Sequence, residues 1–259
     1  MERKDSDHCG AKVNVTPTAE QVWAAAEFQP LALNDKPVDF TKLMDGWGET
    51  EVARLVTGVK MGFVQGQTTR QIVKSVVGAG GLADISERNA ATVIRTALSH
   101  VSNEARNETY RQNDDIIEKY EWVSTLDSRT STICRARDGM TWEIGKGPMP
   151  PAHPNCRSCT APVISSEFDF LDKGAKRAAK GADGGTQVSA DTTYYEFLKQ
   201  QPAWFIDEAL GPVRGKIFRN SGISPEEFRV ISVDGFGNPL TLKQMAELDK
   251  RVADYLKGD

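Results

Sequence analysis

Apolar residues recur at helical intervals through the first half of the chain. Between residues 86 and 113 they fall three and four positions apart, which predicts one long amphipathic helix capped by Ser86. Its apolar stripe consists of Ala90, Val93, Ile94, Ala97, Leu98, Val101 and Ala105. A shorter helix is expected after Thr68, because Gln71 stands at capping-box spacing and Gly78 ends the apolar run. Residues 39–65 predict one or two further helices, which glycines weaken.

The pattern changes beyond residue 113. A β-prone run over residues 116–123, a turn signal at Asp138-Gly139 and a second run over residues 160–164 predict a small sheet, with Pro162 interrupting its last strand. Further on, residues 194–210 predict a helical segment broken at Pro202, and a final amphipathic helix begins near Leu240. The fold class is therefore α+β, mainly helical with a small β-sheet that carries a Cys/His loop motif.

Composition shifts divide the chain into four parts. Residues 1–37 predict an N-terminal arm with one short helix near residues 20–28, and residues 38–171 predict a domain of helices and the small sheet. Residues 172–193 contain cations and clustered glycines without apolar periodicity, which is typical of a linker. Residues 194–259 form the predicted C-terminal helical region.

Charge and cysteine usage narrow the functional class. The 36 acidic and 32 basic residues give a net charge of −4, which argues against a surface built throughout to coat nucleic acid. The sequence has neither a long apolar run nor the apolar core of a signal peptide, so we expect a soluble protein made in the cytoplasm, without a membrane partner. Four unevenly spaced cysteines do not resemble a disulfide scaffold.

Candidate chemistry gathers in one short region. Cys134, His153, Cys156 and Cys159 supply three thiolates and one imidazole, the ligand set of a structural zinc site. The alternative is that Cys134 and Cys156 are buried thiols or a pair across a hairpin, with His153 bonded within its proline-rich turn. A cysteine hydrolase using His153 would lack an evident third orienting group. We therefore expect no enzymatic activity and no small-molecule substrate.

The polar residues around this region predict loop structure rather than catalysis. Asp127 and Thr130 can cap local backbone donors, and the Asp138-Gly139 sequence is typical of a turn. Arg129 or Arg157 can form a bidentate pair with a carboxylate.

A separate basic cluster lies in the predicted linker. It consists of Lys173, Lys176, Arg177 and Lys180. These cations can contact DNA phosphates, or they can belong to a solvated linker.

Three motifs give the chain a family resemblance. They are Asp127-Ser-Arg-Thr, Cys134 followed by Asp138-Gly139, and Pro150-Pro-Ala-His-Pro-Asn-Cys-Arg157. With these motifs the chain resembles the Mu F-like phage head morphogenesis proteins, also called minor head or minor capsid proteins. Three segments downstream resemble the C-terminal part of such proteins: residues 195–202, 210–218 and 239–242. Minor head proteins often carry a second cysteine three residues before Cys134, where this chain has Ser131.

The resemblance implies a virion protein of the head or portal vertex, made in the host cytoplasm. It implies a role in head (procapsid) morphogenesis at or near the portal, with assistance to DNA packaging or ejection. The implied partners are the portal protein, the major capsid or scaffold proteins and phage DNA. The alternative function is a zinc-knuckle nucleic-acid-binding module that presents Arg135, Arg137 and Arg157 to phosphate. The excess of acidic over basic residues argues against this alternative.

Overall fold

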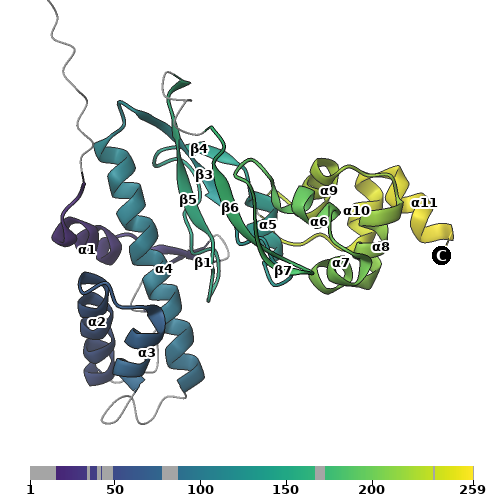
Figure 1. The fold of residues 1–259 in the computed structure, drawn as a ribbon. Coiled ribbons are helices and arrows are strands. Elements are labelled where there is room, and N and C mark those ends of the chain that lie inside the picture. Colours follow the sequence, from purple (N-terminus) through teal and green to yellow (C-terminus); the bar gives the residue numbers. More distant parts are fainter. Residues whose placement is uncertain are drawn as a thin grey trace, which may run out of the picture.

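The computed structural model describes residues 16–33, 36–39, 42, 49–77, 87–166, 173–235 and 237–258. Three parts follow one another along an elongated molecule: N-terminal helices, a central sheet and C-terminal helices (Figure 1). Helices dominate, and the sheets are small and antiparallel, which confirms the predicted α+β class.

One long helix organises the N-terminal part. α4 (Glu87–Gln112) packs against α2 (Glu49–Val64) and α3 (Thr69–Val77), and its predicted apolar stripe forms much of their shared core. The capping box before α3 is present, with Thr68 N donating to Gln71 Oε1 over 2.8 Å. Gly58 and Gly62, which weakened the helix prediction, let α2 approach α3, because a Cβ there would collide with α3 side chains.

The predicted N-terminal arm is part of the folded structure from its short helix onward. α1 (Ala19–Phe28) buries Val22 and Ala26 against α4, and His100 bonds through Nε2 to the Ala26 carbonyl oxygen over 2.8 Å. A two-stranded hairpin of β1 (Leu31–Leu33) and β2 (Lys36–Val38) follows. Residues 1–15 of the predicted arm and the predicted cap Ser86 lie outside the described residues.

The central sheet has β3 (Ile117–Val123) between β4 (Thr141–Glu143) and β5 (Cys159–Ile164). Pro162 lies in β5, at the edge of this sheet, where a missing N–H donor costs no ladder bond. Tyr110 near the end of α4 bonds to Thr160 of β5, with 3.2 Å between their oxygens. Between β3 and β4 the chain forms α5 (Thr132–Arg137), a short helix that the sequence did not predict.

The predicted linker is wrong for residues 173–193. β6 (Lys176–Gly181) and β7 (Gly184–Ser189) form a regular antiparallel hairpin. Its apolar periodicity is weak because most of its side chains are exposed, and it is instead held to the central part by backbone contacts. One of these is the bond from Lys180 N to the Leu126 carbonyl oxygen, at 2.8 Å.

The C-terminal region is helical, as predicted. Its helices are α6 (Tyr194–Lys199), α7 (Ala203–Leu210), α8 (Pro212–Asn220), α9 (Pro225–Ser232), α10 (Leu242–Leu248) and α11 (Lys250–Gly258). Pro202 is the N-cap of α7, which explains the break at that position. Tyr195, Phe218 and Phe228 form an aromatic core with ring centroids 4.9–5.9 Å apart.

Candidate metal centre

Two segments bring the candidate ligands together. Cys134 lies in α5, whose N-cap is Ser131, and the loop after β4 returns His153 and Cys156 to the same place. A tight turn joins the last two residues, since Cys156 N donates to the His153 carbonyl oxygen over 3.1 Å and Asn155 adopts a left-handed conformation with φ of 58°. Cys134 and Cys156 are buried, and Trp122 and Ala152 pack beside them.

The distances among these side chains suit a metal ion. Cys134 Sγ lies 3.6 Å from Cys156 Sγ and 3.2 Å from His153 Nε2. Zinc bonds of about 2.3 Å to sulfur and 2.0 Å to nitrogen, at tetrahedral angles, separate two sulfurs by about 3.8 Å and sulfur from nitrogen by about 3.5 Å. The three side chains therefore fit the zinc that the sequence motif implies, with small adjustments.

Cys159 does not belong to this group, so its prediction as a metal ligand is wrong. The cluster of potential ligand atoms contains only Cys134, His153 and Cys156 among the described residues. A C-x2-C pair binds one ion from a tight turn, but here the chain is already extended as β5 at Cys159, which pairs with Val123.

Ser131 lies beside the Cys134–His153–Cys156 group. Its Oγ is 2.8 Å from His153 Nε2 and accepts a bond from Cys134 N over 3.4 Å. This is the position at which the family resemblance implies a cysteine. The serine oxygen therefore lies beside two of the three clustered ligands, Cys134 and His153.

Hydrogen bonding prepares the group for a cation. His153 Nδ1 lies 2.9 Å from the Pro154 carbonyl oxygen, which favours the tautomer with a proton on Nδ1 and a lone pair on Nε2. Hydrogen bonding from Cys134 lowers the pKa of Cys156, and His153 adds to this effect. The same bond, with burial, raises the pKa of Cys134. Hydrogen bonding between the two thiols therefore favours the loss of one proton from the pair.

An ion pair between the buried Asp127 and the exposed Arg157 fixes the loop that carries His153 and Cys156. Arg157 donates to both carboxylate oxygens of Asp127, over 2.6 and 2.9 Å, which confirms the predicted bidentate pair. Asp127 Oδ1 also accepts from Arg129 N over 3.0 Å, as predicted for a local cap. Thr130 Oγ1 instead acts as a donor, to the same Asp127 oxygen over 3.2 Å and to the Thr125 carbonyl oxygen. Arg129 itself is largely exposed, 3.8 Å from the Asp127 carboxylate.

We expect this pair to make stability depend on acidic pH. Burial alone would raise the pKa of Asp127, but the bonds from Arg157 outweigh it and hold that pKa below the usual 3.8. The stabilisation is therefore complete above pH 3.8 and is lost as pH falls through the lower folded-state pKa. Asp127→Asn should lower the free energy of unfolding by about 1–2 kcal/mol at pH 7, discounted for the exposure of Arg157, and by much less at pH 3. Urea unfolding across this range measures the difference, and an equal deficit at both ends would contradict it.

Asp138 does far more than form the predicted turn. Gly139 does adopt the turn conformation, with φ of 79°. However, the Asp138 carboxylate also accepts from Ser124 N over 2.6 Å, from Tyr194 N over 2.7 Å and from both terminal nitrogens of Arg177 over 2.8 and 3.0 Å. It thus joins β3, the β6–β7 hairpin and α6, a role that the sequence did not reveal.

The predicted DNA contacts do not form one set. Arg177 is buried against Asp138, so its assignment to DNA is wrong. Lys173, Lys176 and Lys180 remain exposed on the hairpin segment. The sequence missed Arg95 and Arg106, which lie on one face of α4 and line a groove with Arg129 and Arg157. Their spacing of eleven residues, three helical turns, is the signal that could have linked them.

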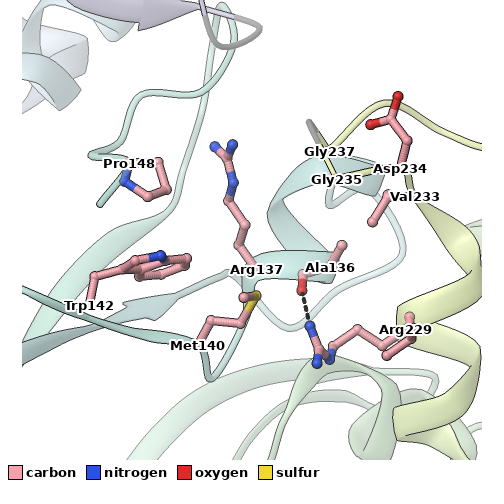
Figure 2. Close-up of a pocket in the computed structure, with 11 residues that line it drawn as sticks. Ala136, Arg137, Met140, Trp142, Pro148, Arg229, Val233, Asp234, Gly235 and Gly237 are labelled. Carbon is pink, nitrogen blue, oxygen red and sulfur yellow. Dashed lines mark hydrogen bonds between the residues drawn. The ribbon is translucent and has the colours of Figure 1, made fainter. Parts of the chain in front are cut away.

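All three arginines of the zinc-knuckle alternative contact other groups of the chain, Arg157 through its pair with Asp127. Arg135 is buried and donates to the Ala209 carbonyl oxygen over 2.6 Å. Arg137 projects into a hollow of about 620 Å³ between α5, β4 and α9, with its guanidinium 5.2 Å from the centre of the Trp122 ring (Figure 2). One wall of this hollow is fixed by a bond from Arg229 to the Ala136 carbonyl oxygen, at 3.1 Å.

Comparison with known proteins identifies the central part. Residues 53–161 match the family described as Phage Mu protein F like protein. This part of the chain is similar to Mu F-like phage proteins. The matched residues run from α2 into β5 and include the three clustered ligands, Asp127 and Asp138. No curated protein and no solved structure matches the chain.

The family match indicates a phage head morphogenesis protein and, with it, a place in the virion. The three downstream segments that resemble minor head proteins lie beyond the matched residues, so their resemblance stays a prediction. Among the described residues, no helix is both long and apolar enough to cross a membrane.

Proposed function

We propose that this chain is a Mu F-like minor head protein that joins the procapsid at or near the portal and assists DNA packaging or ejection. The observation that carries the proposal is the family match over the part of the chain that contains the Cys/His group. Its partners would be the portal protein and the major capsid or scaffold proteins.

A structural role, without enzymatic activity, suits the local chemistry. His153 donates toward a backbone carbonyl rather than toward a carboxylate that would orient it as a catalytic base. The ionic groups nearby hold loops and secondary-structure elements together, as Asp127 and Asp138 show.

Co-sedimentation tests this proposal. The purified full chain should associate saturably with portal rings and with procapsids that contain the portal, and much less with procapsids assembled without it. Cys134→Ser/Cys156→Ser should weaken the association, because it removes two clustered ligands. Cys159→Ser is the matched control, because this thiol lies outside the group. Absence of association with every particle, or equal association with portal-free procapsids, would overturn the proposal.

A further inference from the structure

The strongest unassigned feature is the groove between α4 and the loops of the Cys/His region. Its volume is about 940 Å³, and four arginines line it without any carboxylate side chain among the described lining residues. Two come from α4 and two from the loops: Arg95, Arg106, Arg129 and Arg157. We call it the arginine groove. Such a concentration of cations in a chain of net charge −4 favours an anionic ligand.

Most of this positive charge is available to a ligand. Asp127, behind the groove wall, offsets one charge through its pair with Arg157 and its weaker contact with Arg129. Arg95 is exposed, and no carboxylate of the described residues forms an ion pair with it. Within the described part of the chain, Arg106 donates to a carbonyl of its own helix, that of Ser102, and to no carboxylate. The groove therefore carries about three uncompensated charges.

The spacing of the cations fits a polymer better than a single phosphate. Arg95 and Arg106 are eleven residues apart, which places them about 16 Å apart along the axis of α4. This distance covers about five nucleotide steps of one DNA strand, at 3.4 Å per step. Ser99 and Ser102 line the groove between them and offer hydroxyl groups to the same anion. Polar donors interleaved with arginines are typical of contacts to a sugar–phosphate backbone.

We propose that the arginine groove binds the phosphate backbone of DNA, independently of base sequence. The choice of DNA over an acidic polypeptide rests on the proposed function, because a head protein works beside packaged DNA. It also rests on the arginine fork, whose planar donors match phosphate oxygens in pairs. Arg129 and Arg157 lie in the loops of the Cys/His group. Ordering of that group would therefore also position these two of the four arginines.

Salt dependence of DNA binding tests the groove. Fluorescence anisotropy of a labelled DNA duplex should show that the full chain binds DNA and that binding weakens with salt. A plot of log Kd against the logarithm of the salt concentration should be linear. Arg95→Gln/Arg129→Gln removes two exposed groove cations and should reduce the slope by about 1.8, with a loss of about 60-fold in affinity at 0.1 M salt. Lys176→Gln/Lys180→Gln removes the same charge from the exposed hairpin and should change the slope by much less. Matching thermal melts of both variants check the fold.

Three outcomes would overturn this assignment: no salt-dependent binding by the native chain, equal losses in both variants, or displacement of DNA by polyglutamate at equal charge concentration. The last outcome would assign the groove to an acidic protein segment. Co-sedimentation of the groove variant with nuclease-treated portal rings separates the two proposals. If the groove variant still associates with the portal but no longer binds DNA, both the portal proposal and the groove proposal are supported. If the native chain binds DNA through the groove but does not associate with the portal, only the portal proposal fails.

Discussion

Asp138→Ala is expected to destabilise the protein by about 3–5 kcal/mol, well beyond the cost expected for Asp127→Asn. The Asp138 side chain is fully buried, and its partner Arg177 is only 8% exposed. Removal of the carboxylate would leave the guanidinium buried without its counter-charge. It would also leave two backbone donors, those of Ser124 and Tyr194, without the oxygens that they contact. Because these groups lie in three elements, the loss should loosen the junction between the sheet and the C-terminal helices.

Urea unfolding of the purified variants measures this cost. Asp138→Leu/Arg177→Met should recover part of the stability, because it removes both charges together rather than stranding one. Glu143→Ala breaks the exposed pair with Lys146 and is the matched control, which should leave the urea midpoint close to the native value. If Asp138→Ala unfolded at the same urea concentration as this control, the carboxylate would not hold the three elements together.

The Asp138–Arg177 pair also shows what kind of information the sequence lacked. Helices such as α4 could be predicted because burial repeats every three to four residues along one local segment. A bond between residues 39 positions apart leaves no such period, and the sequence therefore indicated only that Arg177 was one cation of a basic segment, available to DNA phosphates or to solvent. The β6–β7 hairpin was missed for the same reason: contacts with Leu126 and Asp138 hold it, rather than an apolar face of its own.

The sequence identified most residues of the candidate site but not how they are arranged in space. Equal three-residue steps made His153, Cys156 and Cys159 look equivalent, yet a turn joins the first two and a strand begins at the third. The short helix α5, which places Cys134 beside Cys156, has too few residues for a clear periodic pattern. The family resemblance, rather than the spacing, drew attention to Ser131, and the structure places its hydroxyl against His153.

This position leads to the second large effect, on metal affinity. Ser131→Cys should raise the affinity for zinc by about 100-fold or more. Structural zinc sites with four ligands bind with about 10–16 kcal/mol, so a further thiolate is worth about 3 kcal/mol. The native chain should bind one zinc through Cys134, His153 and Cys156, with the fourth corner completed weakly. Competition with a chromophoric chelator measures both affinities, and chelation should lower the melting temperature of the Ser131→Cys variant more than that of the native chain.

Two controls make the metal assignment decisive. Cys159→Ser should leave zinc affinity unchanged, because that thiol begins β5 and stands apart from the group. Cys156→Ser should abolish tight binding in both backgrounds, because it removes the side chain that hydrogen bonding already biases toward the thiolate. Cobalt in place of zinc should show thiolate charge-transfer absorption that strengthens in Ser131→Cys. If neither chain bound zinc in a 1:1 ratio, Cys134 and Cys156 would be buried thiols whose contact serves packing, and Ser131 would be only the N-cap of α5.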